Sequence, residues 1–222
     1  MNPTLKYLQD KFGIDPKGRI TQVHNWNRTI MAKALGELGF KIGAEIGVAQ
    51  GFYSKILLDN NPKLKLFMVD IWDIYDGYHM YGNKIKAYYN QARERVKEHE
   101  GRVRVIKKLS MDAVKDFPDN SLDFVFIDAA HDFMHVAEDV NEWSKKVRVG
   151  GIVFGHDYKR SAYKYTDVYD CIPAWCYAKR CLPLIEMKPD ILDPMFKRDN
   201  PCWGFVRLET NQLMPPEELE FK

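Results

Sequence analysis

The chain has 222 residues, of which 45% are hydrophobic, which is enough to bury one core and typical of a single globular domain. Its 33 basic and 31 acidic residues give a formal net charge of +2, so no broad field of one sign is present to gather nucleic acid or anionic lipid. The four cysteines, at positions 171, 176, 181 and 202, match neither a metal-binding knuckle nor a dense disulfide framework. With no signal-peptide pattern and no apolar run of about 18 residues, we expect a cytoplasmic protein without a membrane partner.

Residues 1–40 are predicted as a lead-in to the fold, irregular up to residue 20 and helical from Thr21. In the helical part the apolar residues recur at steps of three and four, and Gly39 follows at a position typical of a C-cap. The apolar positions are Val23, Trp26, Ile30, Ala34 and Leu38.

From residue 41 onward, strand-like and helix-like runs alternate. Strands are predicted at residues 41–48, 63–70, 102–107, 121–128 and 150–157, and helices at 51–60, 84–99, 110–116 and 132–147. A loop, a helix at 168–181 and strands at 184–188 and 202–208 follow, so residues 41–210 form the predicted core and residues 211–222 a surface tail. This alternation predicts an α/β fold with a mostly parallel sheet covered by helices on both faces, and ligands at the carboxyl ends of its strands.

The first predicted strand ends in a loop of small residues, Gly47-Val48-Ala49-Gln50-Gly51, that would let a ligand approach the backbone. The spacing does not match the GxGxxG of dinucleotide enzymes, and the preceding Glu45 disfavours an anionic ligand. Glu45 suits a cationic amino acid group, and Asp70, at the end of the second strand, suits two ribose hydroxyls. S-Adenosylmethionine has both features. The alternative is that Glu45 caps a local group and Asp70 only ends a strand.

The chain resembles the class I Rossmann-like methyltransferases, within them the group that carries IDAAHDF (127–133) followed by GGIVFGHDY (150–158). The resemblance covers most of residues 41–160. It implies a doubly wound, seven-stranded sheet of order 3-2-1-4-5-7-6 with an antiparallel last strand. It also implies S-adenosylmethionine as cofactor, with the methionine part near Glu45, Gly47, Gln50, Gly51, Phe52 and Tyr53, the ribose on Asp70, and the adenine between Ile71, Trp72, Ser110 and Met111. Asp128 is expected to face the transferred methyl group.

Asp128 and Asp157 end the fourth and fifth strands, so their carboxylates are expected to converge as catalytic residues. Metal-dependent O-methyltransferases of this fold bind magnesium at these strand ends, so the resemblance makes Asp128, His156 and Asp157 a candidate metal site. Imidazole is a poorer magnesium ligand than carboxylate, and Asp157 could instead be a loop carboxylate. His131, three residues after Asp128, is a candidate general base or an orienting hydrogen-bond partner.

The acceptor is expected to be a small molecule or a carbohydrate, because Tyr-rich loops follow Asp70 and Asp157 and aromatic rings interleaved with polar groups suit polyhydroxylated ligands. These tyrosines could equally pack a lid. Two other functions stay open: an N-methyltransferase acting on protein or nucleic acid, and a non-catalytic binding protein of the same fold. The residues after the fourth strand, Asp128-Ala129-Ala130-His131, differ from the Asn/Asp-Pro-Pro-aromatic segment typical of nucleic-acid amine methylation. A homodimer through the N-terminal helix or these loops is also open.

Overall fold

The computed structural model describes residues 1–74, 82, 84–160, 166–189 and 199–213. Its helices are α1 (Pro3–Phe12), α2 (Arg28–Glu37), α3 (Phe52–Asn60), α4 (Lys84–Arg95), α5 (Ser110–Ala113), α6 (Phe133–Lys146) and α7 (Val168–Ala178), with short 3-10 turns η1 (Lys97–Arg102) and η2 (Val114–Asp116). Its strands are β1 (Ile20–Val23), β2 (Ile42–Ile46), β3 (Lys65–Asp70), β4 (Val103–Lys107), β5 (Leu122–Ile127), β6 (Val147–Gly155), β7 (Leu184–Met187) and β8 (Cys202–Val206).

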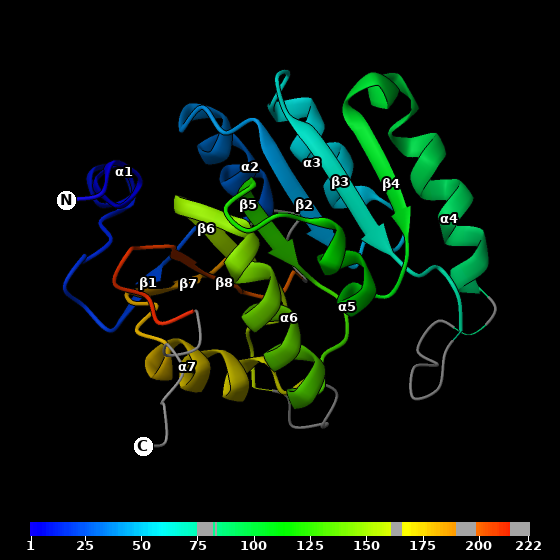
Figure 1. The fold of residues 1–222 in the computed structure, drawn as a ribbon. Coiled ribbons are helices and arrows are strands. Elements are labelled where there is room, and N and C mark those ends of the chain that lie inside the picture. The colour runs from blue at the N-terminus through cyan, green and yellow to red at the C-terminus, as the bar shows by residue number, and fades with distance from the viewer. Residues whose placement is uncertain (75–81, 83, 161–165, 190–198, 214–222) are drawn as a thin grey trace, which may run out of the picture.

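The described strands form one eight-stranded sheet of order β1-β7-β8-β6-β5-β2-β3-β4 (Figure 1). Strands β2 to β8 have the order that the family resemblance implied, and β8 runs antiparallel to both β6 and β7. The α/β Rossmann-like class is therefore confirmed. The sheet has one strand more than predicted, because β1 adds to its edge in parallel with β7.

The first 40 residues differ from their prediction. Residues 3–12 form a helix, whose first turn is capped by the side chain of Asn2, which accepts hydrogen bonds from the backbone N–H groups of Thr4 and Leu5. Thr21 belongs to β1, so the helix predicted from that residue begins at Arg28 instead. A four-residue strand on a sheet edge is specified by its partner, here residues 184–187, which no local periodicity reveals.

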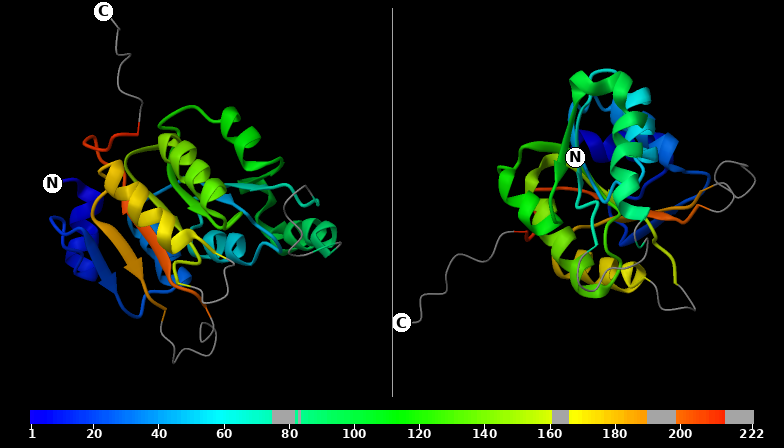
Figure 2. Two further views of the ribbon diagram at one scale, coloured as in Figure 1. Left: turned by 90° about the horizontal axis from the view of Figure 1, so that it is seen from below. Right: turned by 90° about the vertical axis from the view of Figure 1, so that its right-hand side faces the viewer.

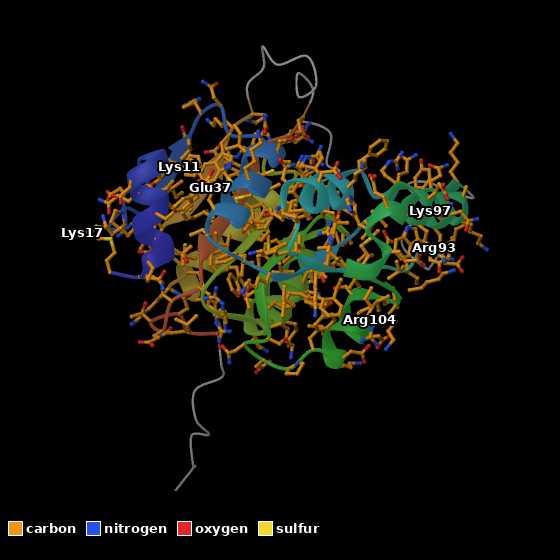
Figure 3. All side chains as sticks on the ribbon, turned by 90° about the horizontal axis from the view of Figure 1, so that it is seen from above. Lys11, Lys17, Glu37, Arg93, Lys97 and Arg104 are labelled. Atoms are coloured by element: carbon orange, nitrogen blue, oxygen red, sulfur yellow. The ribbon has the colours of Figure 1, made fainter. Side chains whose placement is uncertain are left out.

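Helix α1 is held against the rest of the molecule at two points. The buried hydroxyl of Thr4 donates to the carbonyl of Gly150, 2.6 Å away, at the bend inside β6. Tyr7 and Lys11 both donate to Glu37 at the end of α2. Figure 3 labels Lys11 and Glu37 on these two helices. The lead-in segment thus extends the helical layer on one side of the sheet.

Helices cover both faces of the sheet (Figures 1 and 2). Along β5, Phe124 and Phe126 belong to the core cluster shared with α1, α2, α3 and α4, whereas Val125 and Ile127 belong to the cluster shared with α5, α6 and α7. This alternation follows from the two-residue period of a strand. Among the described residues, no helix combines the length and apolar character needed to cross a bilayer.

Three predicted segments lie partly outside the described residues. The Tyr-rich loops after Asp70 and Asp157 include residues 75–81, 83 and 161–165, and the predicted tail includes residues 214–222.

Packing between β2 and β5 gives a test of the core. A Cβ on Gly43 would lie 2.2 Å from Cζ of Phe124, so we expect Gly43→Ala to destabilise the fold by about 1–3 kcal/mol through overpacking. Gly101→Ala is the matched control, because a Cβ there meets no atom within 4 Å, and its effect should stay within about 0.5 kcal/mol. Urea unfolding measures both. Equal effects of the two substitutions would contradict this packing, whereas partial recovery in Gly43→Ala with Phe124→Leu would support it.

Candidate active site

A cavity of about 600 Å³ opens at the carboxyl ends of the parallel strands. It lies where the sheet order reverses between β2 and β5, the position at which doubly wound folds bind ligands. The walls come from the loop after β2, the ends of β3 and β4, the segment Asp128–His131 after β5, His156 and Asp157 after β6, and the cavity-facing side of α6. The topology therefore brings together residues that are far apart in the sequence.

The loop after β2 turns sharply between the strand and α3. Gly47 has a φ of +83°, and a Cβ there would lie only 2.1 Å from the carbonyl oxygen of Asp128. Only glycine combines this left-handed backbone with so close an approach. The loop therefore lies directly against the segment that carries Asp128.

Asp70 organises this loop from the end of β3. Its Oδ2 accepts hydrogen bonds from the backbone N–H groups of Val48 and Ala49, both at 2.9 Å, and its Oδ1 accepts one from Trp72 at 2.8 Å. The Trp72 indole in turn donates to the carbonyl of Ala49, 2.8 Å away. Trp72 is fully buried and lies behind the loop, outside the cavity lining.

Glu45 is buried on the cavity wall, with only 2% of its surface exposed. The hydroxyl of Ser54 donates to its carboxyl group, and Glu45 forms no ion pair with any described residue. Burial raises the pKa of Glu45 from its ordinary value of 4.5 to about 8. A cationic group bound beside it would stabilise the ionised form.

Acidic and imidazole side chains meet on the other side of the cavity. His131 Nε2 lies 3.3 Å from Asp128 Oδ1 and 3.3 Å from Asp157 Oδ2. Burial disfavours the charged form of His131, but the hydrogen bond with Asp128 and the two carboxylate charges outweigh it and raise the pKa of the imidazole. The two carboxylates therefore converge on one histidine, as their strand-end positions predicted.

His156 is held between carboxylates as well. Its Nδ1 lies 3.2 Å from Asp157 Oδ1, and its Nε2 lies 2.9 Å from Asp199 Oδ1. Burial disfavours the imidazolium, but Asp157 and Asp199 outweigh this and raise the pKa of His156 to about 10. Despite its own burial, Asp157 has a lowered pKa, chiefly because of its contact with His156.

A further ion pair, which the sequence reasoning missed, supports this arrangement from two distant segments. Arg28, at the start of α2, donates to both carboxylate oxygens of Asp199 through Nε and Nη2, at 3.1 and 2.9 Å. The next residue, Asn200, donates to Asp157 Oδ1. Neither Arg28 nor Asp199 lies in a motif, so no local signal identified them.

Three of these side chains have the geometry of a cation site. One ligand atom from each of Asp128, His131 and Asp157 can be chosen so that all lie within 4.8 Å of one another. The two nitrogens of His156 face Asp157 and Asp199, so the group that could hold an ion contains His131, whereas the sequence analysis proposed His156. Two carboxylates and one imidazole suit a divalent transition ion better than Mg²⁺, which prefers oxygen ligands.

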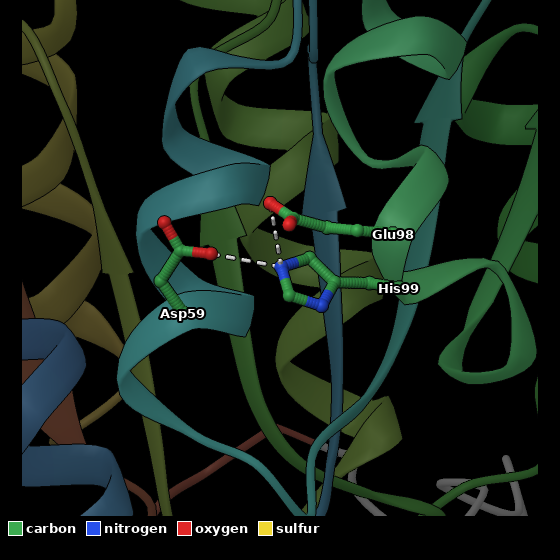
Figure 4. A group of neighbouring side chains, drawn as sticks. All are labelled: Asp59, Glu98 and His99. Carbon is green, nitrogen blue, oxygen red and sulfur yellow. Dashed lines mark hydrogen bonds and ion pairs between the residues drawn. The ribbon is translucent and has the colours of Figure 1, made fainter.

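A second such cluster, Asp59, Glu98 and His99, lies on the surface between α3 and η1 (Figure 4). Lys55 forms ion pairs with both carboxylates, and Arg102 contacts the other nitrogen of His99 at 2.9 Å. Because these cations already neutralise the group, it is a surface ion-pair network rather than a metal site.

Most residues predicted for the site line the cavity. They are Glu45, Gly47, Gln50, Phe52, Tyr53, Asp70, Ile71, Ser110, Met111, Asp128, His131, His156 and Asp157. Gly51 and Trp72 are not part of the lining: Gly51 is the N-cap residue of α3, with a φ of +74° and Ala92 beside it, and Trp72 packs behind the loop. The lining also includes residues that were not predicted, among them Arg28, Lys108, Glu138 and Asp139.

The fold and the cavity at its switch point define a Rossmann-like α/β protein of the kind found among methyltransferases. A family model described as a methyltransferase domain matches residues 44–158, just over half of the sequence, and the chain belongs to this family. A search of curated proteins finds no match.

Solved structures share the fold at low sequence identity. An O-methyltransferase from Bacillus cereus in complex with SAH is 14% identical, covers 92% of this chain and 90% of its own, and has a TM-score of 0.58. A putative caffeoyl-CoA O-methyltransferase from Staphylococcus aureus is 14% identical over 81% and 82% of the two chains, with a TM-score of 0.58. The N-methyltransferase NodS from Bradyrhizobium japonicum is 15% identical over 82% and 95%, with a TM-score of 0.56.

The buried carboxyl group of Glu45 makes stability depend on pH. Its pKa is raised in the fold, so between about 4.5 and 8 the unfolded chain is ionised while the folded chain holds a proton, and stability falls as the pH rises. We expect Glu45→Gln to remove this loss. The free energy of unfolding of the variant should therefore rise relative to that of the wild type by up to roughly 1.4 kcal/mol per pH unit in this window. Urea unfolding at pH 5 and pH 8 measures it. The same change in the free energy of unfolding between pH 5 and pH 8 in both proteins would contradict the raised pKa.

Proposed function

We propose that the chain is an S-adenosylmethionine-dependent O-methyltransferase that acts on a hydroxyl group of a small molecule. The observation that carries this proposal is a single cavity with a buried, unpaired Glu45 on one wall and His131 between Asp128 and Asp157 on another. The first wall suits a cationic cofactor, and the second can remove a proton from an acceptor hydroxyl. Membership of a methyltransferase family and the O-methyltransferase names of structural neighbours support it.

The residues around the loop after β2 fit the cofactor. Glu45 offers a carboxylate to the ammonium group of the methionine part, and Asp70 offers oxygens that already accept backbone N–H groups and retain lone pairs for ribose hydroxyls. Leu109 and Met111 provide apolar surface at the end of β4 for a flat base. When bound, S-adenosylmethionine supplies an electrophilic methyl group on its sulfonium.

In this proposal His131 in its neutral form, which is available above its raised pKa, takes the proton from an acceptor hydroxyl. The resulting oxygen would be the nucleophile for the methyl group that S-adenosylmethionine would supply. Asp128 and Asp157 stabilise the imidazolium that results, because both lie 3.3 Å from Nε2. His156, held by Asp199, fixes Asp157 in place. The rate gain comes from alignment and from charges that are already oriented.

Asp128, His131 and Asp157 are also the residues that would hold a divalent cation, which would lower the pKa of a coordinated hydroxyl. The acceptor is proposed as a small molecule, with carbohydrates as the first class to test. The tyrosines that suggested a sugar lie largely in residues 75–81 and 161–165, outside the described residues.

The proposal predicts that the purified chain binds S-adenosylhomocysteine and transfers a labelled methyl group from S-adenosylmethionine to a hydroxyl compound. Calorimetry measures binding, and mass spectrometry of a panel of sugars, nucleotide sugars, catechols, peptides and amines measures transfer. Absence of binding would refute the cofactor assignment, and transfer to amines alone would replace O-methylation by N-methylation.

His131→Ala should lower kcat by about 10²–10⁴-fold, because the acceptor proton loses its base, while the affinity for S-adenosylhomocysteine changes little. His24→Ala is the matched control, since His24 is exposed and lies outside the cavity lining. Steady-state kinetics and calorimetry measure both variants. Unchanged turnover in His131→Ala would contradict its role as the base. Loss of turnover on chelation, with recovery on adding Mg²⁺, would assign the activation of the hydroxyl to a cation.

A further inference from the structure

One buried carboxyl group on the cavity wall has no part in the proposed reaction. Asp139, on α6, is 3% exposed and lines the cavity next to Ser110 and Leu109 at the end of β4. It forms no ion pair with any described residue, and the hydroxyl of Ser110 donates to its Oδ1. Burying a carboxyl group is costly unless its oxygens find donors.

The hydrogen bonds around Asp139 run in one direction. The indole N–H of Trp143 is a donor only, and it donates to Ser110 Oγ at 2.8 Å. The Ser110 hydroxyl, which has one proton, therefore donates it to Asp139 Oδ1. The hydrogen-bond chain from Trp143 ends at Asp139 Oδ1, and no described side chain donates to the other carboxyl oxygen, Oδ2. A ligand in this part of the cavity would have to supply the donor.

The surroundings of Asp139 suit the edge of a flat heterocycle. Ile71, Leu109 and Met111 line the same cavity with apolar surface, and Leu109 and Met111 flank Ser110, the hydrogen-bond partner of Asp139. A base lying against the apolar side chains would present its edge to α6. Among the edge groups of adenine, only the exocyclic amine is a hydrogen-bond donor.

We infer that Asp139 is a specificity-determining residue that accepts a hydrogen bond from the exocyclic amine of adenine in the cofactor. This inference rests on the proposed function. Ser110 positions the carboxylate, and Trp143 fixes the direction in which Ser110 donates. Burial raises the pKa of Asp139 to about 7, so above that pH the free protein presents a carboxylate there.

The test compares S-adenosylhomocysteine with its deaminated analogue, S-inosylhomocysteine, by calorimetry at pH 8.5. Deamination replaces the amine by a carbonyl oxygen, so two acceptors would face each other, and we expect the wild type to prefer the adenine compound by at least about tenfold. Asp139→Asn should reduce this preference at least about fivefold, because its amide N–H can donate to the carbonyl oxygen. Glu138→Gln is the matched control, an exposed neighbour that also lines the cavity, and it should keep the wild-type ratio.

The inference would be overturned if Asp139→Asn had the same Tm as the wild type and kept the same ratio of affinities for the two compounds. Equal affinity of the wild type for the two compounds would overturn it without any substitution, which covers the case in which Asp139→Asn fails to fold. If the wild type binds neither compound, the proposed function itself fails. The ratio of affinities separates the roles, since a purely structural Asp139 would alter both affinities equally.

Discussion

The close approach of two backbone segments at Gly47 is the constraint on which the site depends. The N–H of Asp128 donates to the carbonyl of Ile46 at 2.8 Å, and the N–H of Gly47 donates to the carbonyl of Val69 at 2.9 Å. The ends of β2, β3 and β5 are thereby joined at one point. Glu45, Asp70 and Asp128 each lie within two residues of this junction, so their carboxyl groups surround one cavity without help from a long loop.

Asp70 shows how one side chain can serve both the fold and a ligand. Three backbone N–H groups already donate to its two oxygens, which holds the loop after β2 in shape. Burial raises the pKa of Asp70 despite these hydrogen bonds, whose own effect is to favour the carboxylate. A carboxylate fixed in this way is preorganised for hydroxyl groups, since no side-chain rearrangement is needed on binding.

The charged groups on the acceptor side form an alternating network rather than isolated pairs. Arg28, Asp199, His156 and Asp157 follow one another with opposite charges in contact, and His131 joins Asp157 to Asp128. Because each buried charge has an opposite partner, the cost of burying the group is offset locally. The same contacts restrict rotation of the imidazoles, which holds them where charge would develop during methyl transfer.

The sequence by itself determined where the core strands lie along the chain and which residues end them, because a buried parallel strand and an amphipathic helix each leave a local pattern. The order of the strands in the sheet was implied by the resemblance to class I methyltransferases. That was enough to place Glu45, Asp128, His131 and Asp157 on one cavity. The prediction for the N-terminal segment was wrong. The caps at Asn2 and Gly13 do mark α1 locally, but β1 depends on pairing with β7. Only the tertiary structure joined Arg28, Asp199 and Asn200 to the site and turned Trp72 away from it. Such contacts depend on side chains brought together across more than 40 residues, or on hydrogen bonds to a particular backbone turn, and neither leaves a periodic trace in the sequence.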